Sequence, residues 1–204
     1  MIDGPGATAR TFVALTLDPQ LAERVLAAVE QALDSGDARR HFRLPPADGL
    51  HLTLFFLGQL ERGLLTRVQA ELGTRLTGLA APRLTLEATG AFPSRTRERV
   101  LWVGVGERAS PGLLGTCRSA VLSALSAAGI DTRPEEQRPF RPHLTVARLR
   151  EAQTRENRVR VPSTFYQLAF DDSWTPYQVT LFESELGRGP ARHLPRARFA
   201  LRET

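Results

Sequence analysis

The tripeptide His-Leu-Thr occurs twice in this chain, and each copy opens an apolar, strand-like stretch. The first copy is HLTLFFLG at 51–58 and the second is HLTVARLR at 143–150. Side chains alternate between the two faces of a strand, so the histidine and the threonine of each copy share one face and the apolar residues share the other. Each stretch can therefore pack one face on a helix and leave an imidazole and a hydroxyl on the opposite face.

The elements expected around the two copies repeat the same order. Strands are predicted at 11–17, 50–57, 83–92, 99–105, 143–149, 164–170, 177–186 and 191–201, and helices at 19–34, 61–78 and 110–128. Strand–helix–strand thus appears twice, with one His-x-Thr strand in each half. We predict two similar lobes within one domain, residues 10–204, after a loose N-terminal tail at 1–9.

Composition indicates a basic globular domain. The net charge is +5 and all 27 basic residues are arginine, which a coding bias explains in part. A basic surface favours polyanions such as nucleic acid, and the forked guanidinium suits phosphate.

The single cysteine, Cys117, excludes an internal disulfide and is expected to be a buried filler in a reducing compartment. No apolar run reaches about 18 residues and no signal peptide is visible, so we expect a cytoplasmic protein that does not bind membranes.

Two histidines with two hydroxyl donors suit displacement at phosphorus. Such a reaction needs a base that deprotonates the attacking group and an acid that protonates the leaving oxygen. Histidine serves both roles because its pKa lies near neutral pH, and hydroxyls can donate to the non-bridging oxygens where charge develops. A 2′,3′-cyclic phosphate is an apt substrate, because its strained ring carries its own leaving group. This chemistry requires neither a metal nor another cofactor.

Other readings of the histidine pair are weaker. A zinc site usually has three protein ligands, and neither strand carries a Cys, Asp or Glu on its histidine face. The chain has no GxxxxGK[ST] or GxGxxG loop for phosphate and no GxSxG nucleophile elbow. For either strand alone, a partly buried structural histidine would be the simpler explanation; the duplication favours function.

At this point the sequence resembles a known family, the 2H phosphoesterases, and within it the bacterial and archaeal RNA 2′,3′-cyclic phosphodiesterases, also called 2′-5′ RNA ligase-like proteins. The defining mark of this family is two H-x-T/S-x motifs, matched here by HLTL at 51–54 and HLTV at 143–146. TFVALTLDP, PSRTRERVLWVGV, PFRPHLTVARL and LFESELGRGPARHLPRARFAL resemble further family segments, so the similarity covers nearly the whole chain.

The resemblance implies an α+β fold with two pseudo-symmetric lobes of antiparallel sheet, outer helices and a central cleft. It implies that 2′,3′-cyclic phosphates at RNA ends or on nucleotides are hydrolysed to 2′-phosphates, by a protein that we expect to be a monomer. His51 would protonate the leaving 3′ oxygen and His143 would activate water. Thr53 and Thr145 would hold the phosphate, and Arg148 would approach the phosphate or nucleotide. Arg148 lies an odd number of residues from His143, so only a bulge or a strand end would turn it to the same face.

The sequence departs from the family pattern near the expected nucleotide site. A family tyrosine near the C-terminus is replaced by His193, so Phe42 or Phe140 is predicted to stack on the base instead. His41 and His193 are expected to be surface residues; the alternative for His41 is that it lines the cleft and contacts RNA. Two alternatives stay open: a nucleotide- or RNA-binding module that uses the same cleft without turnover, and an RNA ligase that runs the reverse reaction. Two intact histidines favour catalysis, because binding alone needs no acid and no base.

Overall fold

The computed structural model describes residues 8–35, 37–107, 111–150, 159–185 and 191–203. Its longer helices are α1 (Pro19–Asp34), α3 (Arg62–Leu76) and α4 (Leu113–Ala127). Its short helices are α2 (Ala38–His41), η1 (Ala47–Gly49), α5 (Arg133–Glu136) and α6 (Ser163–Tyr166). Its strands are β1 (Thr8–Thr16), β2 (Phe42–Arg43), β3 (His51–Glu61), β4 (Leu84–Ser94), β5 (Arg97–Gly106), β6 (His143–Leu149), β7 (Ser173–Trp174), β8 (Gln178–Glu185) and β9 (Arg192–Ala200).

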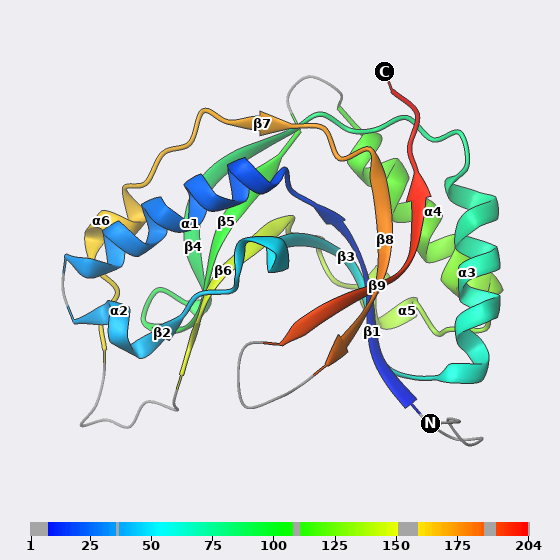
Figure 1. The fold of residues 1–204 in the computed structure, drawn as a ribbon, viewed down its shortest axis with the longest axis horizontal. Helices are drawn as coiled ribbons and strands as arrows, with labels where there is room; N and C mark the ends of the chain where they lie inside the picture. Colours follow the sequence, from blue (N-terminus) through cyan, green and yellow to red (C-terminus); the bar gives the residue numbers. More distant parts are fainter. Residues whose placement is uncertain (1–7, 36, 108–110, 151–158, 186–190, 204) are drawn as a thin grey trace.

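The described strands form one curled antiparallel sheet with the order β7-β4-β5-β6-β3-β1-β8-β9, and β2 also pairs with β6, outside this order (Figure 1). Its two halves, β7-β4-β5-β6 and β3-β1-β8-β9, meet where β3 and β6 pair through Leu52 and Leu144. The predicted α+β fold with antiparallel sheet and outer helices is confirmed. The sequence did not indicate that the two half-sheets are joined edge to edge through the two His-x-Thr strands.

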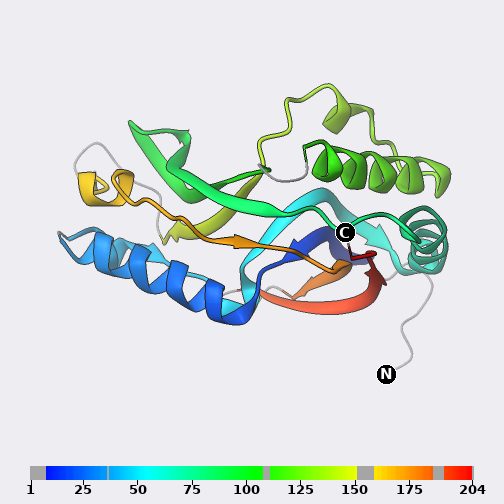
Figure 2. The ribbon, with the colours of Figure 1, turned by 90° about the horizontal axis from the view of Figure 1, so that it is seen from above.

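The helices lie over the sheet halves in a crossed arrangement. Helix α1, which follows β1, lies with α2 and α6 at the end of the molecule that holds β4, β5 and β6 (Figures 1 and 2). Helices α3 and α4 lie at the other end, although α4 follows β5 (Figure 1). Each half of the sheet is therefore covered by a helix that follows a strand of the other half, which ties the two lobes into one core.

Helix α1 shows why these residues fold as predicted. Asp18 caps its first turn by accepting a hydrogen bond of 3.1 Å from the backbone N–H of Leu21, and Pro19 occupies the first helical position. Leu21, Val25 and residues at helical spacing beyond them are buried on one side of the helix. Full burial of such a side chain contributes about 1.5–3 kcal/mol, so the amphipathic pattern anchors the helix to the sheet.

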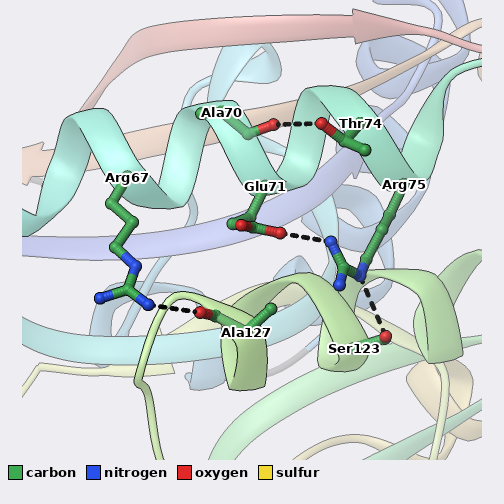
Figure 3. Close-up of polar contacts among 7 residues, drawn as sticks. All are labelled: Arg67, Ala70, Glu71, Thr74, Arg75, Ser123 and Ala127. Atoms are coloured by element: carbon green, nitrogen blue, oxygen red, sulfur yellow. Dashed lines mark hydrogen bonds and ion pairs between the residues drawn. The ribbon is translucent and has the colours of Figure 1, made fainter.

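Polar contacts join α3 to α4 along their exposed sides. Arg67 donates a hydrogen bond of 2.9 Å to the carbonyl oxygen of Ala127, and Arg75 donates one of 3.1 Å to the hydroxyl of Ser123 (Figure 3). Arg75 also pairs with Glu71 one turn earlier on α3. These surface contacts are each worth little. The association of the two helices rests on buried apolar side chains between them and the sheet, among which Cys117 is the predicted filler.

The structure corrects one predicted strand and shows where the predicted N-terminal tail ends. The stretch 164–170 was predicted as a strand, but its first half belongs to helix α6. One helical turn after Pro162 suffices to bury Phe165, and a short apolar run cannot distinguish a turn of helix from a strand. Within the predicted tail, residues 8 and 9 belong to β1, while 1–7 lie outside the described residues. None of the described helices is both long and apolar enough to cross a membrane.

Candidate active site

Both His-x-Thr strands place their side chains with the predicted alternation. The apolar residues next to each histidine and threonine are buried in the core, at Leu52, Leu54, Leu144 and Val146. The histidines and threonines are partly exposed on the opposite face. Because Leu52 pairs with Leu144 in antiparallel register, Thr145 lies opposite His51 and Thr53 lies opposite His143. The four side chains therefore form one diagonal set on one face of the sheet.

The two histidines are held in the same way. Nδ1 of His51 lies 2.8 Å from the carbonyl oxygen of Gly49, and Nδ1 of His143 lies 2.6 Å from that of Arg141. A carbonyl oxygen can only accept, so each Nδ1 carries a hydrogen and donates it. This fixes the tautomer of each neutral ring and leaves Nε2 as the atom that can take up or release a proton.

His51 is packed among aromatic rings from the other three strands of its half-sheet. Phe12 of β1 stacks on it with ring centroids 4.7 Å apart, and His193 of β9 meets it edge to face at 5.1 Å. His193 also contacts Phe12 edge to face at 4.9 Å. Phe182 of β8 completes this cluster, stacked on Phe12 at 5.1 Å. The result is an imidazole whose ring is shielded from water on several sides.

His143 is supported by the β4–β5 hairpin. Phe92 meets its ring edge to face at 5.1 Å, and the Trp102 ring lies tilted to it at 6.3 Å. Trp102 reaches this place across Gly90 on the neighbouring strand, where an added Cβ would lie 2.1 Å from the indole ring. A glycine is required at that position for the indole to lie against the hairpin.

These surroundings lower the pKa of both histidines by unequal amounts. Burial is the main cause for His51 and lowers its pKa from 6.5 to about 4, with His193, Arg148 and His143 adding smaller repulsions. Burial also lowers the pKa of His143, followed by repulsion from Arg148, but the shift is smaller. In each case the hydrogen bond to the backbone carbonyl works in the opposite direction. The ligand-free site therefore favours neutral imidazoles, above all at His51.

A bulge brings Arg148 to the histidine face, as the sequence required. Leu101 pairs with Ala147 and the next residue, Trp102, pairs with Thr145, so Val146 is an extra residue in β6. Val146 and Ala147 are both buried, and Arg148, one residue further on, is exposed. Arg148 lines a cavity together with Thr145 and His193.

That cavity adjoins the histidine pair and has a volume of about 260 Å³. Its described lining combines charged and apolar residues from β2, β6, β9 and the residues that flank these strands: Arg43, Leu44, Pro45, Thr145, Arg148, Leu149, Arg150, Ala191 and His193. Guanidinium groups beside an apolar wall suit a ligand with both phosphate and planar apolar parts.

Two sequence predictions are wrong in the light of these positions, and a third stays a prediction. Phe42 is fully buried in the core, so the prediction that it stacks on a base is wrong: its ring has no exposed face. Phe140 is half-buried with the Arg118 guanidinium 4.5 Å over its ring, and its stacking role stays a prediction. The expectation of His193 as a plain surface residue is wrong, because its ring contacts His51 and lines the cavity.

Sequence reasoning also missed the aromatic supports of the two histidines, Phe12, Phe92, Phe182 and Trp102. These residues lie on strands that were predicted correctly, but local sequence patterns do not determine how those strands pair with β3 and β6. One signal was present: the alternation of β1 puts Phe12, Ala14 and Thr16 on one face.

Among the described residues, no group of three His, Cys, Asp or Glu side chains is arranged to hold a metal ion.

An antiparallel sheet that presents two His-x-Thr pairs on one face defines a two-histidine phosphoesterase. The chain belongs to the 2′-5′ RNA ligase superfamily, whose family model matches residues 17–187.

Relatives and solved structures agree with this placement. The chain is 33% identical over 172 residues to a protein of Thermus thermophilus named RNA 2′,3′-cyclic phosphodiesterase, covering 83% of this chain and 81% of the relative. It is 30% identical over 200 residues to a protein of that name from Escherichia coli, covering 94% and 96%. The crystal structure of E. coli LigT complexed with 3′-AMP matches with a TM-score of 0.71 and 28% identity, over 96% of this chain and 99% of that one.

Proposed function

We infer that this protein is an RNA 2′,3′-cyclic phosphodiesterase, a hydrolase that opens the cyclic phosphate at the end of an RNA. The observation that carries this conclusion is the diagonal set of two histidines and two threonines on neighbouring strands. Each histidine Nδ1 is hydrogen-bonded to a backbone carbonyl oxygen, so each Nε2 is the atom that can exchange a proton with the substrate or water. The family membership and the name that its relatives carry support the same reaction.

The reaction needs one neutral and one protonated imidazole. Nε2 of His143 takes a proton from water as the water oxygen bonds to phosphorus, and the bond from phosphorus to the 3′ oxygen breaks. His51 gives its Nε2 proton to that 3′ oxygen, which leaves a 2′-phosphate. Proton exchange with solvent resets both rings. The division of roles follows the family resemblance, because the two motifs are equivalent by themselves.

Substrate charge has a specific part in this scheme. Burial disfavours the protonated form of His51 in the ligand-free site, since its pKa is lowered to about 4. A cyclic phosphate is an anion, and an anion within about 4–6 Å raises the pKa of a histidine. The acid therefore acquires its proton together with the substrate. Thr53, Thr145 and Arg148 then hold the non-bridging oxygens, where the positive charge of Arg148 and the two hydroxyls stabilise the developing negative charge.

The test is hydrolysis of a nucleoside 2′,3′-cyclic phosphate in excess EDTA, with the product resolved as the 2′- or 3′-phosphate. We expect turnover to persist in EDTA and to give the 2′-phosphate, because two imidazoles supply both proton transfers without a metal. A nucleoside 3′,5′-cyclic phosphate, which lacks the strained five-membered ring, serves as the matched control and should react far more slowly. Loss of turnover in EDTA with recovery in zinc or manganese would overturn the metal-free mechanism, and a 3′-phosphate product would overturn the assigned leaving group.

A further inference from the structure

His193 is a third imidazole beside the two catalytic histidines, and no step of the proposed reaction uses it. Its ring centroid lies 5.1 Å from that of His51 and 4.9 Å from that of Phe12, and both contacts are edge to face. His51 and Phe12 stack on each other at 4.7 Å, so the three centroids form a nearly equilateral triangle. Packing therefore holds the His193 ring against the side chain that protonates the leaving oxygen.

His193 reaches this place because its half of the sheet is curled. Strands β1 and β8 lie between β3 and β9 in the sheet order, so three spacings of about 4.8 Å would put β9 about 14 Å from β3 in a flat sheet. The rings of His51 and His193 are nonetheless 5.1 Å apart. The curl of the sheet (Figure 1) thus brings a residue of the last strand onto the histidine face.

The ring of His193 also lines the cavity that adjoins the histidine pair. Thr145 and Arg148, two of the side chains that hold the phosphate in the proposed reaction, line the same cavity. A phosphate that is hydrogen-bonded to Nε2 of His51 lies within reach of His193, because the two rings are in contact. His193 is therefore placed at the border between the reacting phosphate and the cavity.

The two ring nitrogens of His193 lie in different surroundings. Nδ1 is buried and has no hydrogen-bond partner among the described residues, whereas Nε2 is not buried, so a ligand in the cavity can reach it. A neutral imidazole carries one hydrogen, and a buried N–H without an acceptor is strongly disfavoured. The hydrogen of neutral His193 is therefore on Nε2. This is the reverse of His51 and His143, whose Nδ1 atoms donate to carbonyl oxygens.

The surroundings of His193 also keep it neutral. Burial is the main cause that lowers its pKa, the charge of Arg148 and then that of Arg10 lower it further, and the charge of Asp48 acts in the opposite direction. The ring of His51, which touches it, also opposes a positive charge at this position once it is protonated itself. A second proton on His193 would go to Nδ1 and leave a buried N–H without an acceptor. His193 is therefore a neutral donor at and above neutral pH.

We propose that His193 donates a hydrogen bond from Nε2 to the phosphate of the substrate, as a third substrate-binding side chain beside Thr145 and Arg148. This assignment rests on the proposed function, which places the phosphate among the histidines and threonines. The three imidazoles of the site then divide by tautomer. Two have the hydrogen on Nδ1 and exchange protons at Nε2, and the third has the hydrogen on Nε2 and holds the phosphate.

The tautomers can be measured directly. Two-bond ¹H–¹⁵N correlation spectra of the ligand-free protein above neutral pH identify the protonated nitrogen of each neutral imidazole. We expect Nδ1–H for His51 and His143 and Nε2–H for His193, with the His193 signals assigned by their loss in His193→Gln. A hydrogen on Nδ1 of His193 would overturn the proposal, because Nε2 would then have nothing to donate to an anion.

Two variants separate hydrogen bonding from packing. His193→Phe keeps a flat ring and removes the donor, whereas His193→Gln removes the ring and keeps an N–H at a similar distance along the side chain. Calorimetry with adenosine 2′-monophosphate should give a Kd about tenfold higher for His193→Phe than for the unmodified protein, the scale of one hydrogen bond to a charged group. The increase should be smaller for His193→Gln. If His193→Phe binds as tightly as His193→Gln or more tightly, the ring only packs and the proposal fails.

Inorganic phosphate, which has no nucleoside, tests whether the hydrogen bond goes to the phosphate. NMR titration with it should give the same order of affinities, and an affinity that is unchanged in His193→Phe would overturn the assignment to the phosphate. Tyr177→Phe is the matched control variant, because it also removes a donor from an aromatic ring. Tyr177 is 51% exposed and precedes β8, at the end of that strand far from the pair of Ser184 and His193, so both affinities should be unchanged. Thermal unfolding of each variant checks that the fold persists.

Binding without turnover separates this proposal from the proposed function. If the cyclic substrate is not hydrolysed but His193→Phe binds adenosine 2′-monophosphate more weakly than His193→Gln, the role of His193 stands and the proposed activity fails. If turnover occurs but the unmodified protein and both variants bind adenosine 2′-monophosphate equally, the activity stands and the role of His193 fails.

Discussion

The two His-x-Thr strands share a local design but lie in different surroundings. In both, the Nδ1 atom of the histidine donates to the carbonyl two residues earlier, and a bulge follows the threonine. The bulge turns the residue five positions after each histidine back toward the histidine face. That residue is Phe56 on β3, 45% exposed with Arg10 over its ring, and Arg148 on β6. The shared design fixes where the histidines sit.

The surroundings make the two histidines chemically different. Phe12 stacks on His51 and His193 closes its side, so burial lowers its pKa to about 4. The ring of His143 is held by a hairpin and its pKa falls less. Duplicating a motif therefore duplicates the positions of two functional groups. The difference between their pKa values comes from neighbouring strands that are not duplicated.

The largest expected effect is the loss of either imidazole. His51→Ala and His143→Ala should each lower kcat by roughly 10²–10⁴-fold, because each removes one proton transfer. The double variant should lose much less than the product of the two losses, since the histidines act on one transition state. Single-turnover rates on a 2′,3′-cyclic nucleotide measure this. Retention of near-normal kcat in either single variant would remove that histidine from the chemistry.

The leaving group sharpens the comparison between the two variants. A nitrophenyl phosphodiester has a good leaving group that needs little protonation, so it should partly rescue His51→Ala and should not rescue His143→Ala. The control is the unmodified protein with both substrates, which sets the intrinsic difference in reactivity. Rescue of His143→Ala alone would show that the roles are reversed, and equal rescue would leave both histidines catalytic without distinct roles.

The alternation of residues made part of this comparison predictable from sequence. From this alternation we predicted that His51 and Thr53 share one face of their strand. We also predicted that Arg148 can share a face with His143 only if a bulge separates them, and the register of β5 and β6 contains that bulge. The alternation could not place Phe12 against His51, because that contact depends on the pairing of β1 with β3 across nearly forty residues of chain. Long-range strand pairing is set by the packing of the whole sheet rather than by local pattern.

The prediction that Phe42 stacks on a base failed for a related reason. Phe42 precedes the first motif and was expected to reach the nucleotide, but β2 pairs with β6 in a register that turns Phe42 into the core and Arg43 toward the cavity. A shift of one residue exchanges the two faces of a strand. The sequence identifies the residues of such a short strand that could reach the nucleotide. Which of them faces the cavity depends on the register in which the strand pairs with its neighbour.

We expect an intermediate effect on substrate binding from the residue five positions after each histidine, which is an arginine on β6 and a phenylalanine on β3. Arg148→Gln should raise KM about tenfold, because one charge-assisted contact to the phosphate is lost. Phe56→Leu changes the residue at the equivalent position of β3 and keeps most of its apolar volume, so its effect should be smaller. Steady-state kinetics on one cyclic nucleotide compare the two. If Arg148→Gln leaves substrate affinity unchanged, the arginine is structural.

A smaller effect concerns proton binding in the ligand-free protein. NMR titration of the imidazole Cε1–H signals should show His51 titrating near pH 4 and His143 above it but below its ordinary value of 6.5. In the unfolded chain both histidines titrate near 6.5. The unfolded state therefore binds protons first, and the free energy of unfolding should fall as the pH drops from 6.5 toward 4. Titration of His51 at or above the pKa of His143 would contradict the asymmetry.

The smallest expected effect isolates one cause of that asymmetry. His193 is the neighbour of His51 that has no counterpart beside His143, and its repulsion lowers the pKa of His51 after burial and the opposing backbone hydrogen bond. His193→Gln removes a titratable ring but keeps a polar side chain, so the pKa of His51 should rise by a fraction of a unit, where one unit corresponds to about 1.4 kcal/mol. His193→Phe keeps the edge contact with Phe12 and the dry surroundings, so it should raise the pKa less than His193→Gln does, because burial remains the main cause. His41→Gln, which changes a histidine on α2, serves as the control and should leave the His51 titration in place. A pKa of His51 that stays at its original value in both His193 variants would assign its depression to burial by Phe12 and Phe182 alone.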